Sequence, residues 1–154
     1  MKIYCLSLQQ PWASLIVPDD SIRTGPKKVE VRKWDTSFRG NCLIHAGKTI
    51  LKDECKRLDI DPGSLEVGKI IGYANLIETE HPSHTKWVSL QKQHLSKERY
   101  RSYGEDTFFW HFDGETLFAE SVDYAGQLKF FQVPEEVLRE HDIDVDSMEW
   151  GTFK

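Results

Sequence analysis

Cysteine is scarce in this 154-residue chain, which holds only Cys5, Cys42 and Cys55 and no C-x-x-C pair. An odd, scattered set argues against a disulfide framework and against a structural zinc site. Each cysteine lies in an apolar or amphipathic stretch, where a thiol behaves as a small buried hydrophobe. We therefore expect three reduced, buried thiols.

Long apolar runs are also missing. No stretch approaches the roughly 18–20 apolar residues needed to cross a bilayer. The apolar N-terminal stretch is interrupted by Gln9, Gln10 and Pro11, and no small-residue cleavage site follows, which argues against a signal peptide. The expected location is cytoplasmic, or nuclear in a eukaryote, and not secreted, with no membrane partner. Repeats, linkers and low-complexity segments are absent too, so we predict one domain over residues 1–154 with an acidic C-terminal extension from about residue 134.

An overall excess of positive charge is lacking. The net charge of −5 argues against a general nucleic-acid binder, but its distribution is uneven. Residues 1–104 hold 17 Lys and Arg against 12 Asp and Glu, whereas residues 105–154 hold 3 against 13. Between Arg23 and Arg57, ten basic residues face four acidic ones. A phosphate could be bound there locally, the alternative being an ordinary solvated surface with an acidic end.

A complete phosphate-binding loop is absent. Gly47-Lys48-Thr49 resembles the end of a P-loop, but Cys42 stands where the leading glycine is needed, which excludes P-loop nucleotide hydrolysis. A weaker hypothesis remains, in which the start of a helix at Gly47, with Lys48 beside it, holds one anion. The alternative is a capped helix with a surface lysine.

No complete set of metal ligands is present either. Asp142, Asp144 and Asp146 imitate half of a calcium loop, but Ser147 and Phe153 replace its glycine and glutamate. The pair of histidines at positions 81 and 84 has no further ligands at metal spacing. We therefore predict no metal and no cofactor.

The pattern of apolar residues predicts an α+β domain. Alternating or continuous apolar runs predict strands, and longer runs at helical spacing predict helices. The predicted strands cover residues 3–8, 28–33, 42–45, 69–77, 107–112, 117–122 and 129–133, with a hairpin at Asp113-Gly114. The predicted helices cover 12–17, 47–58 and 85–101, with a short acidic one after Pro134. Many strands without regular β-α-β alternation favour a curled mixed sheet or small barrel of about six strands with two or three flanking helices.

One constellation of charged residues stands out, Gly25-x-Lys27-x-x-Glu30-x-Arg32. Glu30 and Arg32 are two apart on a predicted strand and so share one face, which Trp34 extends. Lys27 falls at the boundary between turn and strand. A carboxylate, a guanidinium and an ammonium together suit a planar polar ligand, such as a base edge with a phosphate or carboxylate. The alternative is a solvated strand face with an ion pair.

Three ordered segments resemble the ASCH domain, a member of the PUA-like group: residues 6–16 (LSLQQPWASLI), 25–32 (GPKKVEVR) and 39–48 (RGNCLIHAGK). The later strands of that domain are resembled by residues 68–74 (GKIIGYA) and by Tyr124-x-Gly126. The resemblance implies a small barrel whose cleft binds RNA, DNA or a nucleotide-like ligand. It also implies two enzymatic precedents, ribonucleases and deacylases of N4-acetylcytidine. The deacylating branch has a threonine where this chain has Glu30, so the analogy to that mechanism is broken.

Our first hypothesis is therefore a module that binds RNA, single-stranded nucleic acid or a nucleotide-like ligand in RNA metabolism. The second is a hydrolytic enzyme, a ribonuclease or an amidohydrolase acting on N4-acylated cytidine, with Lys27 and Glu30 as catalytic residues. A protein-interaction module using residues 105–154 is the third. The predicted ligand-binding residues are Gln10, Trp12, Lys27, Glu30, Arg32, Trp34, His45 and Lys48.

Overall fold

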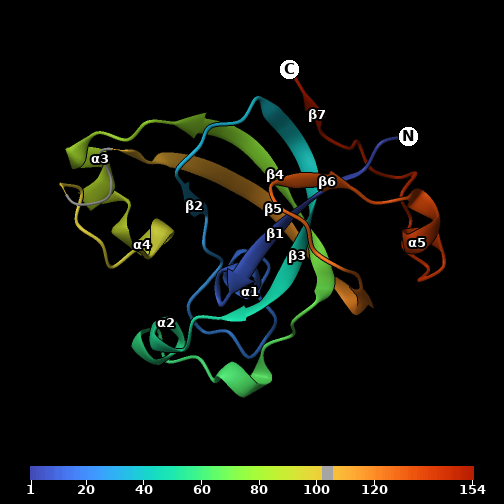
Figure 1. The fold of residues 1–154 in the computed structure, drawn as a ribbon, viewed down its shortest axis with the longest axis horizontal. Coiled ribbons are helices and arrows are strands. Elements are labelled where there is room, and N and C mark those ends of the chain that lie inside the picture. Colours follow the sequence, from blue (N-terminus) through green and yellow to red (C-terminus); the bar gives the residue numbers. More distant parts are fainter. Residues whose placement is uncertain (102–105) are drawn as a thin grey trace.

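The computed structural model describes residues 1–101 and 106–154, and its strands curl into an incomplete barrel with short helices around it (Figure 1). The strands are β1 (Tyr4–Gln10), β2 (Val29–Arg32), β3 (Phe38–Ile50), β4 (Lys69–Glu80), β5 (Phe108–Asp123), β6 (Phe130–Gln132) and β7 (Thr152–Phe153). The helices are α1 (Trp12–Ile16), α2 (Lys52–Arg57), α3 (His84–Ser89), α4 (Gln91–His94) and α5 (Glu135–Arg139), with a 3₁₀ turn η1 (Pro62–Ser64). The predicted curled, mixed α+β sheet is confirmed, with more and shorter helices than expected.

The sheet runs in the order β2-β5-β4-β3-β1-β6, and β7 pairs with β3 outside this path. β1 is parallel to β3, and the remaining pairs are antiparallel. Curling brings the edge strand β2 back toward the start of the chain, so the backbone N–H of Lys27 donates to the Leu15 carbonyl at 2.6 Å. The concave side of the curl is where the site described below opens.

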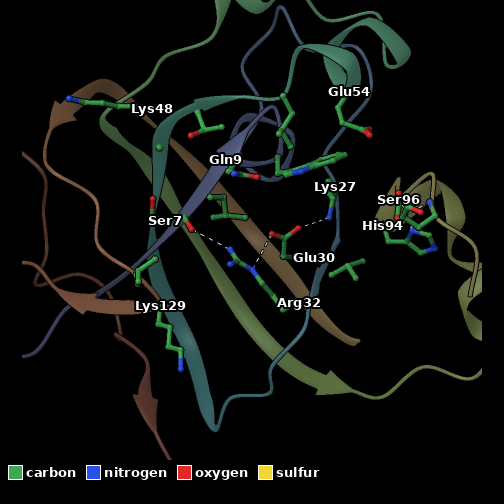
Figure 2. Close-up of a pocket in the computed structure, with 18 of the residues that line it drawn as sticks. Ser7, Gln9, Lys27, Glu30, Arg32, Lys48, Glu54, His94, Ser96 and Lys129 are labelled. Atoms are coloured by element: carbon green, nitrogen blue, oxygen red, sulfur yellow. Dashed lines mark hydrogen bonds and ion pairs between the residues drawn. The ribbon is translucent and has the colours of Figure 1, made fainter. Parts of the chain in front are cut away.

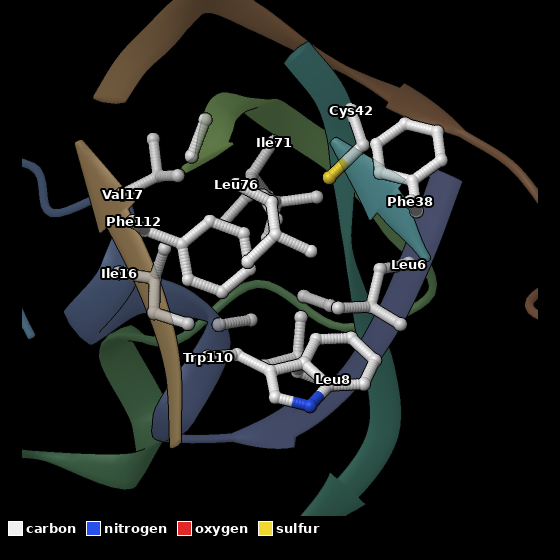
Figure 3. Packing of buried hydrophobic residues seen from close by; sticks show 14 residues of the cluster. Leu6, Leu8, Ile16, Val17, Phe38, Cys42, Ile71, Leu76, Trp110 and Phe112 are labelled. Carbon is white, nitrogen blue, oxygen red and sulfur yellow. The ribbon is translucent and has the colours of Figure 1, made fainter. Parts of the chain in front are cut away.

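The interior of the curl is filled by apolar side chains from the sheet and from α1 (Figure 3). Trp110 and Phe38 are the largest of those without exposed surface, and Leu6, Ile44 and Leu76 pack with them. Each fully buried side chain of this size contributes about 1.5–3 kcal/mol of transfer free energy. This packing makes the sheet a firm support for side chains that point into the cleft.

A second apolar cluster covers the other side of the sheet. It joins Cys5, Leu43 and Ile70 to Leu138 and Val145 of the acidic C-terminal segment. That segment therefore packs on the sheet through its apolar residues, and β7 extends the pairing of β3. The acidic end does not reach over the cleft, since none of the residues that line the cleft lies beyond 129.

The predicted hairpin at Asp113-Gly114 is wrong. Residues 108–123 form one continuous strand of 16 residues, β5, which pairs with the 12-residue β4 through three register shifts. Gly114 has φ +57°, so its glycine does adopt a turn-like backbone, but within a bulge. A long partner strand offers hydrogen bonds on both sides of this position, and this pairing outweighs the local turn preference.

The predicted helix over 85–101 is shorter and broken. α3 and α4 meet at Leu90, and Leu95 takes a left-handed conformation that ends α4. All three cysteines are buried free thiols, as expected. Among the described residues, no helix has the length and apolar character needed to span a membrane.

Candidate functional site

A cleft of about 540 Å³ opens on the concave side of the curled sheet (Figure 2). Its walls come from β1, α1, the segment from Lys27 through β2, the end of β3, α2, α4 with the segment after it, and the loop before β6. The lining residues are Ser7, Leu8, Gln9, Trp12, Lys27, Glu30, Val31, Arg32, Gly47, Lys48, Thr49, Leu51, Glu54, His94, Ser96, Lys97, Glu98, Gln127, Leu128 and Lys129.

Lys27, Glu30 and Arg32 form a charged cluster in this cleft, as the spacing predicts. The alternation of β2 places Val29 in a buried apolar cluster with Phe109 and turns Glu30 the other way. Lys27 Nζ donates to Glu30 Oε1 at 2.8 Å and also to the carbonyl oxygen of Val29. Arg32 Nε lies 3.3 Å from Glu30 Oε2. Glu30 thus lies between two cations.

Burial sets the protonation behaviour of this cluster. Lys27 is 2% exposed and Glu30 6% exposed. Burial lowers the pKa of Lys27, although the carboxylate of Glu30 opposes this shift. Burial by itself would raise the pKa of Glu30, but the charges of Lys27 and Arg32 outweigh it and hold this pKa below its usual value. Glu30 is therefore ionised at neutral pH, with one more cation than anion in the cluster.

Arg32 is the member of the cluster that reaches the open part of the cleft. Its Nη2 donates to the carbonyl oxygen of Ser7 at 3.2 Å, and its guanidinium lies 5.8 Å from the centre of the Trp110 ring. Its Nε is buried and, among the described residues, has no hydrogen bond of good geometry. Its side chain keeps 22% of its surface exposed. A planar, charged donor is thus held in place with part of its edge open to a ligand.

The two tryptophans predicted for the site differ in position. Trp12 lines the cleft, with Lys27 Nζ 5.4 Å from the centre of its ring. Trp34 does not line it, because its ring packs edge-on against Trp110 at 4.7 Å. Lys129 Nζ lies 5.3 Å from the Trp34 ring. Trp34 therefore supports one wall of the cleft from behind.

Gln10 and His45 are buried and do not line the cleft. Gln10 Nε2 donates to Ser14 Oγ at 2.8 Å and to the Glu66 carbonyl at 2.7 Å, and its Oε1 accepts from the Ser14 N–H at 3.0 Å. These contacts use the amide to join β1, α1 and the loop before β4. His45 contacts a cleft residue instead, because its Nδ1 lies 2.9 Å from Ser7 Oγ.

Lys48 lines the cleft, but the helix predicted to begin at Gly47 does not exist there. β3 continues to Ile50, and the helix α2 begins at Lys52. In the pairing with β1, Leu8 stands opposite Ala46 and Gln10 opposite Ile50, so three residues of β3, 47–49, stand opposite one of β1. The hypothesis of an anion held by a helix start at Gly47 is therefore wrong, and Lys48 reaches the cleft from a β-bulge.

The model of the ASCH domain matches residues 6–118, which is more than half of the chain. This chain belongs to the ASCH domain family.

Crystal structures of an ASCH protein from Zymomonas mobilis support the family's fold. A mutant form gives a TM-score of 0.58 at 18% identity and covers 92% of this chain and 94% of that chain. Another structure of that Zymomonas mobilis protein gives a TM-score of 0.55 at 16% identity, and the match covers 97% of both chains. The predicted PUA-like fold is thereby confirmed.

A relative in sequence is activating signal cointegrator 1 of Mus musculus, which is 36% identical over 87 residues. The match covers 49% of this chain and 14% of that protein. This ASCH domain therefore corresponds to only a small part of that relative's length.

Several cleft residues of this ASCH domain carry no signal in the sequence. His94 lies within a predicted helix, yet its Nε2 faces the Trp87 carbonyl at 2.8 Å and its Nδ1 accepts from the Ser96 N–H at 3.0 Å. These contacts define a neutral ring, and burial lowers the pKa of His94. Glu54 pairs with Arg57 at 2.5 Å and lies 3.6 Å from Lys97. Contacts between separate elements place these residues in the cleft.

The cleft differs in charge from the rest of the chain. Among the residues that the structure describes, five cationic side chains line it, Lys27, Arg32, Lys48, Lys97 and Lys129, against three carboxylates, Glu30, Glu54 and Glu98. The whole chain has a net charge of −5. A positive site on an acidic domain attracts an anionic ligand to this one place.

Proposed function

We propose that this ASCH domain binds single-stranded RNA in the cleft, with phosphates near Lys48, Lys97 and Lys129 and one base near Arg32 and Trp12. The observation that carries the proposal is the local excess of cations over carboxylates on an otherwise acidic chain. Phosphate contacts supply most of the affinity in such binding, and a small basic site limits it to a few contacts. The net acidity explains why binding is local.

The arrangement of Arg32 supports base recognition. The Glu30 carboxylate and the Ser7 carbonyl hold the guanidinium in one orientation before any ligand arrives. A guanidinium held in this way loses little side-chain entropy on binding, and it can bond the acceptors of a base edge or stack on a base. The ring of Trp12 provides a second flat surface. A volume of about 540 Å³ falls within the usual range for a pocket that takes one small ligand.

Fluorescence anisotropy with a labelled single-stranded RNA at several salt concentrations tests this proposal. Each phosphate contact with a single strand adds about −0.7 to the slope of log K against log salt. For the wild-type chain we expect a slope between about −1.5 and −3. In the double variant Lys48→Ala/Lys129→Ala the slope should be smaller in magnitude by about 1.4, because two phosphate contacts are lost. Lys2→Ala is the matched control, because Lys2 is exposed and does not line the cleft.

Two results would overturn the proposal. One is an affinity of the double variant equal to that of Lys2→Ala. The other is an affinity for RNA that does not change with salt. Single-stranded DNA and mononucleotides serve as competitors, and competition by a mononucleotide at equal concentration would reassign the site to a small nucleotide-like ligand.

Hydrolysis is the second candidate, either of RNA or of an N4-acylated cytidine. The observation that favours it is the buried Lys27–Glu30 pair, because groups with shifted pKa values in a cleft are frequent in catalytic sites. However, the ammonium of Lys27 is 2% exposed and already donates to Glu30 and to the Val29 carbonyl. These contacts favour a positioning role toward Arg32 over contact with a substrate.

Labelled RNA and N4-acetylcytidine test the enzymatic alternative directly. Turnover by the wild-type chain that disappears in a folded Glu30→Gln variant would support it. RNA binding without turnover of either substrate would reject it for these two reactions.

A further inference from the structure

A histidine and two glutamates lie together on the face of the sheet that points away from the cleft. Glu78 of β4 stands opposite His111 of β5, and Glu80 shares its face because it follows two residues later. His111 in turn stands opposite Val29 of β2, so its side chain lies on the face away from Glu30. One ligand atom from each of the three side chains lies within 4.8 Å of the other two. Among the described residues, this is the one group of His, Cys, Asp or Glu side chains so close together.

A β-bulge brings Glu78 to this face. Leu76 packs in the interior of the curl, and in a regular strand Glu78 would share the face of Leu76. The pairing shifts register between these two residues, so Ile77 is an extra residue and Glu78 turns outward. Bulges often direct side chains at functional sites, and this one places a second carboxylate beside the imidazole of His111.

The ligand atoms of the three side chains are spaced so that one metal ion can bridge them. His111 Nε2 lies 2.5 Å from Glu80 Oε2 and 3.9 Å from Glu78 Oε1. Around a tetrahedral Zn²⁺ with bonds of about 2.0–2.2 Å, neighbouring ligand atoms are about 3.3 Å apart. Small rotations of the side chains therefore suffice to admit the ion. A neutral imidazole with its proton on Nδ1 presents the lone pair of Nε2 to it.

Lys86 of α3, the helix beside this end of β4 (Figure 1), contacts the same glutamate without taking the oxygen that faces His111. Its Nζ lies 2.8 Å from Glu80 Oε1, whereas Oε2 faces the imidazole. A group that bonds the outer oxygen of a ligating carboxylate fixes its orientation, and Lys86 holds Oε2 toward the ion in this way. The side chain of Glu78 is 61% exposed and that of Glu80 25% exposed, so the set is open to an ion from solvent.

We propose that Glu78, Glu80 and His111 bind a divalent transition-metal ion of the Zn²⁺ type, with water completing its coordination. One imidazole nitrogen and two carboxylate oxygens suit Zn²⁺ better than Mg²⁺ or Ca²⁺, which prefer oxygen ligands alone. The set has no signature in the sequence, because Glu80 and His111 are 31 residues apart and belong to different strands. Since it lies on the face away from the cleft, the proposed ion site does not depend on RNA binding.

Isothermal titration of the full chain with Zn²⁺ at pH 7.5 in a non-chelating buffer tests this proposal. We expect about one ion bound per chain, with the affinity lowered about 100-fold or more in His111→Gln and about tenfold or more in Glu78→Gln. His141→Gln is the matched control, because His141 is an exposed histidine that lies with Asp142 and Asp144 at another part of the surface. Equal affinities of the wild-type chain and His111→Gln would overturn the proposal. A loss in His141→Gln as large as that in His111→Gln would also overturn it.

Nuclear magnetic resonance of the imidazole nitrogens covers the case in which His111→Gln does not fold. In the ¹⁵N-labelled wild-type chain, Zn²⁺ should shift the Nε2 signal of the histidine whose ring protons contact the Phe109 ring, which lies 6.1 Å from that of His111. Glu78→Gln removes an exposed ligand with little effect on the fold, and the same shift should then need about tenfold more Zn²⁺. A shift confined to other histidines, or an equal response in Glu78→Gln, would refute the assignment.

Discussion

Glu30→Gln removes the carboxylate between two cations and changes the shape of the side chain very little. Lys27 Nζ lies 2.8 Å from Glu30 Oε1, and Arg32 Nε lies 3.3 Å from Oε2. Among the described residues, Glu30 is the only carboxylate paired with Lys27, which is 2% exposed. The variant therefore leaves a buried ammonium without its counter-ion.

The size of the loss follows from this geometry. At 2.8 Å and an effective dielectric constant of about 20, the gross attraction between Lys27 and Glu30 is about 6 kcal/mol. The variant avoids the desolvation penalty of the Glu30 carboxylate, and this offsets part of the lost attraction. Removing one partner of a buried pair typically costs 3–5 kcal/mol, and we expect the free energy of unfolding to fall by about 3–4 kcal/mol at pH 7.

This loss should shrink as the pH rises. The pKa of Lys27 is already lowered by burial, and removal of the opposing carboxylate lowers it further. The unfolded chain keeps the proton of Lys27 up to a pKa of about 10.4, so above the folded pKa the unfolded state binds more protons than the folded state. The stability of the variant then rises with pH, by at most about 1.4 kcal/mol per pH unit, and its loss relative to the wild-type protein shrinks until the folded wild-type protein also releases this proton.

Urea unfolding at pH 7 and pH 9.5, followed by tryptophan fluorescence, measures both effects. Glu115→Gln is the matched control, because Glu115 pairs with Lys28 at 2.9 Å on the surface, where such pairs contribute about 0–1 kcal/mol. A loss for Glu30→Gln no larger than that for Glu115→Gln would refute the reasoning. So would a loss of stability that grows between pH 7 and pH 9.5.

Two further predictions concern the scaffold. Gly40→Ala should lower the free energy of unfolding by about 2–4 kcal/mol, because Gly40 has φ +114° and an added Cβ would lie 2.5 Å from Gly151 Cα. Gly25→Ala is the comparison, and it should lower the free energy of unfolding by about 1 kcal/mol or less, because an added Cβ there would meet atoms no nearer than 3.4 Å. Chemical denaturation measures both, and equal losses would contradict the assigned contact. The native thiols should react with Ellman's reagent at pH 8 at least 100-fold more slowly than in denaturant, because they are buried and burial raises the pKa of Cys42 to about 12. Rapid titration of any thiol in the native state would refute its burial.

Short-range patterns were sufficient to predict several parts of the fold and the site. Alternation over residues 28–33 placed Glu30 and Arg32 on the face opposite Val29, and the structure has them there. The apolar run after Pro11 predicted α1 to within one residue. These predictions hold because side-chain direction in a strand or a short helix depends on the backbone repeat within a few residues.

Predictions failed where distant strands decide the outcome. Gly114 signals a turn, yet β4 pairs on both sides of it and keeps β5 continuous. Gly47 looked like a helix start, but the pairing of Ile50 with Gln10 of β1 keeps the chain in β3 to Ile50 and places the three-residue bulge there. In both cases pairing with a partner strand outweighs a local preference.

The sequence by itself determined the family, the charged motif on β2 and the uneven distribution of charge along the chain. Only the tertiary structure decided that Gln10 and His45 are buried, that Trp34 supports a wall of the cleft and that Ser7 and His94 line it. It also decided that the acidic C-terminal segment packs away from the cleft. The physical reason is that burial and contact depend on how the sheet curls, and the curl brings together residues whose separation along the chain leaves no periodic signal.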